Sequence, residues 1–219
     1  MDSSVLRAAV RDAFKPYDGL TPGWPAPRPA DAKPEKEEFE NCEDPGKFRI
    51  VAARAEAWIK ALTQTGVAEA ETVEHSPERW RDVAETDPVI REVVLRSKKD
   101  SAVPLVFSFC WLMDEPEARV VVGAGEPAVV LSVHPQCACD ACDTGSDELI
   151  EQFDDMVLNV VSGQLVHVAT DDFVLHTSLE GPVVVGQFTG MTSTKFDEMF
   201  AEARAGRSEH PTVYGSRWW

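Results

Sequence analysis

Four segments rich in β-branched and aromatic residues follow one another in the middle of the chain, with short connections between them. They cover residues 93–96, 103–113, 119–122 and 128–133. Charged turns and a Gly-Ala-Gly-Glu-Pro run separate them, as is typical of strands joined by hairpins. Neighbouring parallel strands need a crossover of about a dozen residues, and these connections are too short to provide one. The pattern therefore predicts an antiparallel meander and argues against a doubly wound parallel sheet.

Two strongly amphipathic helices flank this region. The first begins at Asp44, a capping residue followed by a proline at the first helical position, and ends at Gly66. The second begins near Thr144 and Asp147, which have the spacing of a capping box, and carries apolar residues at helical intervals. The predicted fold class is therefore α+β, with a mostly antiparallel sheet packed against two main amphipathic helices.

Shorter elements are expected near both ends of the chain. Apolar residues at helical spacing predict a helix over residues 3–14, and a similar pattern predicts a last helix that ends at Gly206. Residues 165–169, 173–177 and 183–188 are further strand candidates. The tail that follows the last helix has no periodic pattern.

A proline-rich segment follows the first helix. Six prolines between residues 16 and 34 remove backbone donors and force an extended path. Trp24 is the one large apolar side chain there, and we expect it to dock in a surface groove of the same chain rather than to bind a partner domain. The expected organisation is a short helix plus an extended Pro-rich N-terminal arm over residues 1–43, and a single α+β domain over residues 44–219.

The chain is strongly acidic. Its 219 residues include 38 Asp and Glu against 21 Lys and Arg, a formal charge of −17. This charge repels phosphate backbones and anionic lipid headgroups, so we expect no nucleic acid and no membrane among its partners. The expected partners are a neutral or basic protein, or a second copy of the chain. Trp218 and Trp219 at the C-terminus are expected to dock on the domain or in a partner subunit.

The expected location is the cytoplasm. The first residues lack the basic and apolar regions of a signal peptide, and the longest apolar run, residues 103–113, is too short to span a membrane. The five cysteines are an odd number and are clustered, unlike the spaced, even set of a secreted disulfide scaffold. We therefore expect the thiols to be reduced.

One loop carries a set of metal-binding residue types. The run HPQCACDACD places His134, Cys137, Cys139 and Cys142 within nine residues, between a predicted strand and a predicted helix. Thiolate and imidazole are the ligands of structural zinc sites, and a two-residue separation such as that of Cys139 and Cys142 lets a tight turn direct both sulfurs at one ion. These four residues are the predicted metal ligands, and zinc is the one cofactor expected.

Other interpretations of this loop stay open. Cys42, Cys110 or Asp143 could replace His134 as the fourth ligand, or the cysteines could be small apolar side chains that only pack the loop. Cys142 could also be a redox thiol, because it lies close to a helix N-terminus that stabilises a thiolate. Asp140 and Asp143 flank the thiols and oppose ionisation, which favours metal binding over redox chemistry.

The run from Cys137 to Asp143 also resembles the signature of an uncharacterised family of actinobacterial proteins, classified only as a domain of unknown function. In that family the run is usually Cys-Gly-Cys-Asp-Ala-Cys-Asp, so this chain departs from it at Ala138. The TPGWPAPRP segment and the EDPGKFRIVAARAEAWIKAL helix resemble the N-terminal half of that family. The resemblance covers roughly residues 20–165. It implies a bacterial cytosolic protein with a characteristic cysteine loop, and it implies no activity.

Two further groups of polar residues are candidates for a functional site. A hairpin closed by Asp171-Asp172 would place His167 opposite His176, a pair that could bind a metal or sense pH. Because the alternating apolar residues would take the buried face, we expect both histidines on the solvated face. The Asp154-Asp155 doublet is likewise expected to be solvated charge.

Three classes of function follow from these observations. The preferred one is a cytosolic binding or structural module whose cysteine loop binds one structural zinc ion. The alternatives are a thiol-dependent redox enzyme that uses Cys142, and an acidic, immunity-like module that binds a basic protein. The sequence lacks the common phosphate-binding and nucleophile motifs, so no catalytic residue is assigned.

Overall fold

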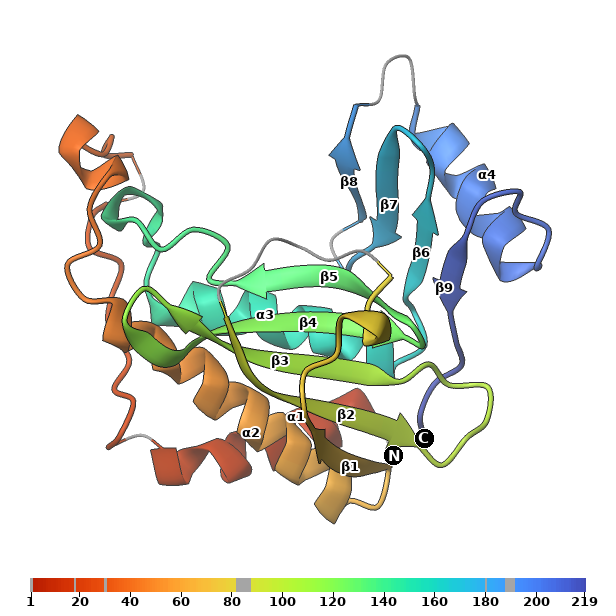
Figure 1. The fold of residues 1–219 in the computed structure, drawn as a ribbon, viewed down its shortest axis with the longest axis horizontal. Helices are drawn as coiled ribbons and strands as arrows, with labels where there is room; N and C mark the ends of the chain where they lie inside the picture. Colours follow the sequence, from red (N-terminus) through yellow and green to blue (C-terminus); the bar gives the residue numbers. More distant parts are fainter. Residues whose placement is uncertain (1, 18, 30, 82–87, 180, 188–191) are drawn as a thin grey trace.

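The described part of the chain forms two antiparallel sheets and four α-helices. The computed structural model describes all residues except 1, 18, 30, 82–87, 180 and 188–191. One sheet has five strands in the order β1-β2-β3-β4-β5, and the other has four in the order β8-β7-β6-β9. Figure 1 shows the smaller sheet standing beside β5, with its strands running across the direction of the larger sheet. The predicted α+β class is confirmed, but the sequence did not separate the strands into two sheets.

The five-stranded sheet is the predicted meander. Every neighbouring pair in it is antiparallel. Its strands are β1 (Ala68–Val73), β2 (Val89–Ser97), β3 (Leu105–Leu112), β4 (Glu115–Gly125) and β5 (Ala128–His134). The edge strand β1 was not predicted, because its Ala-Glu-Ala-Glu-Thr-Val sequence leaves four of its six residues exposed and lacks an apolar face.

Three helices cover one face of this sheet (Figure 1). They are α1 (Ser3–Phe14), α2 (Arg49–Gln64) and α3 (Ser146–Val161). The apolar sides of α2 and α3 pack on β3 and β4, where Phe107 stacks on Phe153 with ring centroids 5.7 Å apart. A fully buried side chain of this size contributes about 1.5–3 kcal/mol to folding. Both main helices therefore lie where the hydrophobic periodicity predicts them.

The helix starts differ from the predicted ones. Asp44 does act as a cap, but its carboxylate accepts a hydrogen bond from the Lys47 N–H of a 3₁₀ turn that precedes α2. At α3 the predicted capping box is wrong. Gly145 is the N-cap residue, with φ of +93°, and no side chain caps the helix there. Its N–H instead donates to the carboxylate of Asp143 at 2.9 Å.

A buried ion pair joins α2 to α3. Arg54 donates from Nε and Nη2 to the two carboxylate oxygens of Asp154, at 2.8 and 2.5 Å, and Trp58 Nε1 donates to the same carboxylate at 2.7 Å. Asp154 is only 5% exposed, so the prediction of a solvated doublet is wrong for this residue. Its neighbour Asp155 points outward and pairs with Arg7 of α1 at 2.9 Å, with 28% of its side chain exposed.

A second buried carboxylate lies on the opposite face of the sheet. Glu92 of β2 is fully buried and is surrounded by hydrogen-bond donors from the β1–β2 connection and from β3. These are His75 Nδ1 at 2.9 Å, Trp80 Nε1 at 2.7 Å, Ser108 Oγ at 2.9 Å and the guanidinium of Arg79. Burial alone would raise the pKa of Glu92, but these hydrogen bonds outweigh it and lower the pKa.

The ring of Trp80 packs on β4 at this face of the sheet. A Cβ at Gly123 would come within 2.4 Å of the Trp80 ring, so the close approach requires glycine there. Trp80 packs in a second apolar cluster with Val94, Val106 and Val121. The hydrogen bonds of Glu92 thus hold the β1–β2 connection against the second face of the sheet.

The four-stranded sheet has its own helix. Its strands are β6 (Val166–Ala169), β7 (Phe173–Thr177), β8 (Pro182–Gly186) and β9 (Thr212–Tyr214), and the helix is α4 (Ser193–Arg204). Phe196 and Phe200 of α4 pack against Val166 and Val168 of β6. Strand β9 lies in the tail that showed no pattern, and it forms by pairing with β6.

The C-terminal tryptophans dock on the chain itself. Trp218 is 2% exposed, and its N–H donates to the Val161 carbonyl at the end of α3 at 3.0 Å. The tail passes so close to Gly163, which has φ of +71°, that a Cβ there would lie 2.4 Å from the Arg217 nitrogen. Of the alternatives that the sequence left open, the structure therefore shows docking on the same chain. Among the described helices, none has the length and apolar character needed to cross a membrane.

Candidate metal centre

The connection from β5 to α3 brings three of the four predicted ligands together. A 3₁₀ turn over Asp140–Cys142 reverses the chain, so that the sulfurs of Cys137, Cys139 and Cys142 all lie within 4.8 Å of one another. The Cys137 and Cys139 sulfurs are 3.1 Å apart. Cys137 and Cys142 are exposed, and Cys139 is half-buried. This group of sulfurs is called the thiol cluster below.

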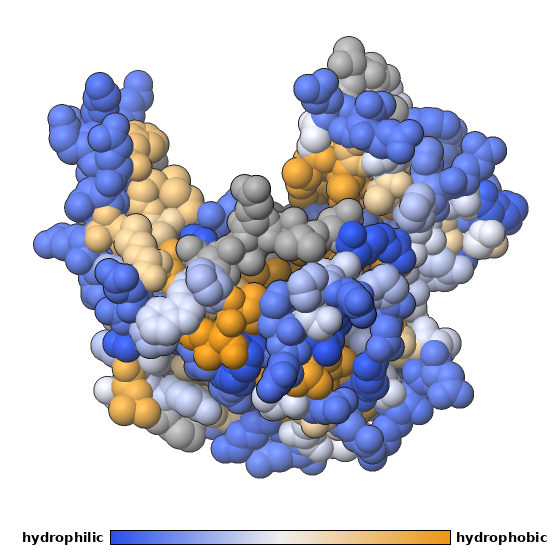
Figure 2. All heavy atoms as spheres, viewed as in Figure 1, coloured by the Kyte–Doolittle hydropathy of each residue, from blue (hydrophilic) through white to orange (hydrophobic). Residues whose placement is uncertain are grey.

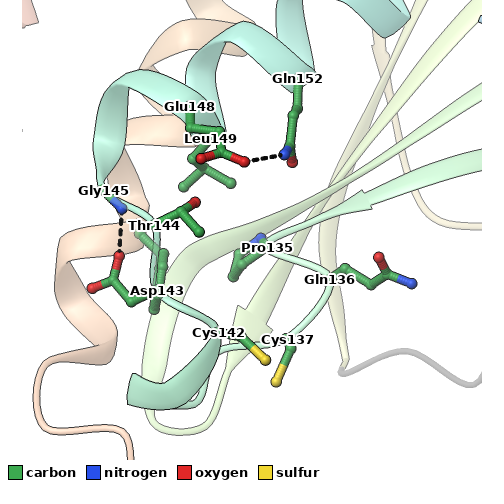
Figure 3. Close-up of a pocket in the computed structure, with 11 residues that line it drawn as sticks. Pro135, Gln136, Cys137, Cys142, Asp143, Thr144, Gly145, Glu148, Leu149 and Gln152 are labelled. Atoms are coloured by element: carbon green, nitrogen blue, oxygen red, sulfur yellow. Dashed lines mark hydrogen bonds between the residues drawn. The ribbon is translucent and has the colours of Figure 1, made fainter. Parts of the chain in front are cut away.

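The thiol cluster lies at one end of a cavity. Figure 3 shows the sulfurs of Cys137 and Cys142 side by side at one end of the group of lining residues, with Glu148 and Gln152 at the other end. The cavity has a volume of about 410 Å³ and is lined by residues of the loop and of the first turns of α3. The sulfurs are therefore open to solvent and to small molecules on one side.

The N-terminal segment holds the turn from the other side. Arg28 donates to the carbonyls of Asp140 and Ala141 at 2.8 Å, and it also pairs with Glu38 at 2.6 Å. The carboxylate of Asp140 accepts from the Asn41 amide at 2.6 Å. These contacts fix the backbone of the two residues between Cys139 and Cys142 and the side chain of Asp140.

Asp143 anchors the other end of the turn. Its carboxylate accepts from Trp24 Nε1 at 2.9 Å, from Lys47 Nζ at 2.6 Å and from the Gly145 N–H at 2.9 Å. Burial would raise the pKa of Asp143, but these three donors outweigh it and lower the pKa. The indole of Trp24 also packs edge-on against Phe48, with ring centroids 5.6 Å apart. Trp24 therefore docks in the chain, as its position in the segment predicts.

The thiols differ in their acidity. Hydrogen bonding with the backbone and the side chain of Cys139 lowers the pKa of Cys137. Hydrogen bonding to Cys139 and Cys137 raises the pKa of Cys142 to about 12. Without a bound metal, the Cys142 thiol therefore stays protonated at neutral pH and is a poor nucleophile, whereas binding of a metal ion would release its proton. This arrangement gives no support to Cys142 as a redox thiol.

His134 lies apart from the thiol cluster. Its Nε2 lies 2.9 Å from Ser132 Oγ, and its ring packs edge-on against Phe153 with centroids 5.3 Å apart. The ring is buried, and it does not belong to the group of ligand atoms within 4.8 Å of one another. The structure therefore does not bring the fourth predicted ligand to the other three.

The alternative fourth ligands lie in different places. Cys110 is buried in the second apolar cluster, on the other face of the sheet, and Asp143 already accepts three hydrogen bonds. Cys42 is half-buried beside the turn, because the Asn41 carbonyl and the Glu43 N–H both bond to Asp140. Cys42 is a candidate ligand by residue type, but no pattern in the sequence predicts that it lies beside the turn.

The predicted histidine pair forms, but its expected exposure is wrong. His167 of β6 pairs with His176 of β7 in the predicted register, and the two side chains are 1% and 4% exposed. One face of the small sheet packs on α4, and the histidine face turns toward β5 of the larger sheet and toward α3. The alternation of apolar residues identifies the two faces, but it does not show that the second one is covered.

We expect the free energy of unfolding to fall as the pH is lowered from about 6.5 to about 4. Burial lowers the pKa of His134 and of His167 from 6.5 to about 4. In this interval the unfolded chain binds protons that the folded chain does not, so each imidazole adds a slope of up to about 1.4 kcal/mol per pH unit. Urea unfolding across the interval measures the slope. His167→Phe should reduce it, and an unchanged slope would contradict a neutral, buried His167.

Comparison with known proteins gives one match. No curated protein and no solved structure matches the chain. The model of a family of unknown function, DUF6226, matches residues 10–219. The match extends well beyond the resemblance recognised in the sequence, which stops near residue 165, and it includes the small sheet and α4. The chain therefore belongs to the DUF6226 family of unknown function.

Proposed function

We propose that the chain is a metal-binding module that holds one zinc ion through Cys137, Cys139 and Cys142. The observation that carries this proposal is the position of three sulfurs within 4.8 Å of one another on one tight turn. Sulfurs bound to one tetrahedral zinc at about 2.3 Å lie about 3.8 Å apart, so only small shifts of the side chains are needed. The partly exposed position leaves an entry path for the ion.

The fourth coordination position is assigned to water or to an external small ligand. His134 bonds to Ser132, and Asp143 accepts three hydrogen bonds, so both are engaged. Cys42 lies beside the turn but does not belong to the group of ligand atoms within 4.8 Å of one another. Three protein ligands plus one exchangeable ligand are typical of a zinc ion that binds or activates a molecule. The cavity of about 410 Å³ beside the cysteines gives such a ligand room.

The ion would also stabilise the loop. It would connect the start of the turn at Cys137 with its end at Cys142, where Arg28 and Asp143 already tie the turn to the N-terminal segment. Because metal binding adds to folding free energy wherever the site exists only in the folded chain, zinc should raise the stability of this region. The proposal also includes a neutral or basic protein as the partner. It places the protein in the cytoplasm, where thiols stay reduced.

Native mass spectrometry of the full chain, purified without added metal or chelator, tests the site. We expect a mass excess of one zinc per chain, and we expect Cys139→Ser to lose it, since one of three thiolate ligands is removed. Cys110→Ser is the matched control, because that cysteine is buried on the other face of the sheet and should retain the full metal content. His134→Gln should also retain it.

Two results would contradict this proposal. One is a wild-type chain without metal that also fails to take up one equivalent of added zinc. The other is a Cys139→Ser chain that binds zinc as tightly as the wild type.

A further inference from the structure

A second, larger cavity lies between the two sheets. It has a volume of about 620 Å³, and its walls are β5 and α3 on one side and β6, β7 and β8 on the other. Figure 2 shows hydrophobic side chains gathered on the side of the smaller sheet that faces the rest of the molecule, next to a deep notch. The two cavities share Gln136, Leu149 and Gln152 in their linings, but the thiols line only the smaller one.

The described residues that line this cavity are mainly apolar. The lining consists mainly of valine, leucine and methionine side chains, and none of the described residues that line the cavity is acidic or basic apart from histidine. Its polar groups are Ser132, His134, Gln136, Gln152, His167 and His176. Its size is that of a typical small-molecule site, and an apolar wall with a few polar groups is typical of such sites.

Two of the polar groups have an unmet hydrogen-bonding capacity. His167 and His176 are 1% and 4% exposed, and Nδ1 of each is buried without a hydrogen-bond partner among the described residues. Their rings lie nearly parallel, with centroids 6.4 Å apart. A buried polar group without a partner destabilises the fold, so such groups in native proteins usually take a partner from ordered water or from a bound ligand.

We infer that this cavity binds an uncharged, mainly apolar small molecule that carries a hydroxyl group. A neutral imidazole offers one donor and one acceptor, and a hydroxyl both donates and accepts, so a hydroxyl can pair with either histidine. An anionic ligand does not fit, because the described residues of the lining include no lysine or arginine and the chain carries a charge of −17. A cationic ligand would find no carboxylate among the described residues that line the cavity. This inference does not depend on zinc.

Equilibrium dialysis with 2-naphthol and naphthalene tests it. The two probes share a ring system, and naphthalene is the more apolar, so burial of apolar surface alone would favour naphthalene. We expect 2-naphthol to bind about tenfold more tightly, because its hydroxyl supplies the missing partner of a buried imidazole. Equal binding, tighter binding of naphthalene, or no binding of either probe would overturn the inference.

Variants locate the binding in the cavity. The double variant His167→Phe/His176→Phe should still bind naphthalene but lose the preference for 2-naphthol, while His210→Phe, at an exposed histidine, should keep it. Val183→Trp, on the edge strand β8, should fill the cavity and weaken both probes at least tenfold. Circular dichroism checks that each variant is folded. If the double variant does not fold, unchanged binding in Val183→Trp alone overturns the inference.

Discussion

Replacing Asp154 by alanine should lower the free energy of unfolding by about 3–5 kcal/mol. The carboxylate accepts two hydrogen bonds from Arg54 and one from Trp58 between α2 and α3, where both charged groups are buried. Without it, the guanidinium of Arg54 keeps its charge but loses its counter-ion. Urea or guanidinium unfolding measures the loss.

The neighbouring residue provides a matched control. Asp155→Ala removes the same side chain one position along α3, but its pair with Arg7 is half-exposed and screened by water. An exposed pair of this kind contributes about 0–1 kcal/mol. Equal effects of the two substitutions would contradict the placement of Asp154 in the core.

Glu92→Ala should cost a similar amount, about 3–5 kcal/mol. The buried carboxylate is the shared acceptor of Arg79, Trp80 and Ser108, so its removal leaves a charged guanidinium and two neutral donors without their partner. Since domains of this size are stable by about 5–15 kcal/mol, this loss would remove a substantial share of the free energy of unfolding. Thermal and urea unfolding measure the effect.

Two further substitutions sharpen this test. Glu71→Ala removes an exposed carboxylate from the edge strand β1 and should change the stability by less than about 0.5 kcal/mol. Glu92→Gln keeps the shape and one acceptor oxygen, and should lose less than Glu92→Ala does. A stability of Glu92→Ala close to that of Glu71→Ala would show that the Glu92 cluster does not hold the β1–β2 connection.

The central sheet and the main helices could be predicted because their signals are local. Runs of β-branched residues with short connections define β2 to β5, and apolar residues at helical spacing define α2 and α3. Strands β1 and β9 carry no such signal. β1 forms because its backbone completes the hydrogen bonds of β2, and β9 forms because its backbone completes those of β6. The residues of β1 and β9 themselves do not predict this pairing.

The sequence-based predictions were wrong mainly about the burial of polar residues. The sequence predicts that Asp154, His167 and His176 are solvated, but all three are buried. In each case the covering partner is distant in the sequence: Arg54 lies 100 residues from Asp154, and the histidine face is covered by β5 and α3. A pattern within one element identifies its two faces, but only the tertiary packing decides whether the polar face meets water.

Only part of the candidate metal centre could be predicted, because only part of it depends on neighbouring residues in the sequence. The spacing of Cys137, Cys139 and Cys142 is local, and the structure brings their sulfurs together. The support of the turn is not local, since Arg28 reaches the Ala141 carbonyl across 113 residues. His134 is close in sequence to the cysteines, but the end of β5 directs its ring toward Ser132 and Phe153 instead.

X-ray absorption at the zinc edge of the zinc-loaded full chain is the most direct test of the proposed centre. The three-thiolate site predicts three sulfur neighbours at about 2.3 Å and one oxygen or nitrogen neighbour at about 2.0–2.2 Å. A spectrum with at most one sulfur neighbour, or with only oxygen and nitrogen neighbours, would place the zinc away from the thiol cluster and contradict the account.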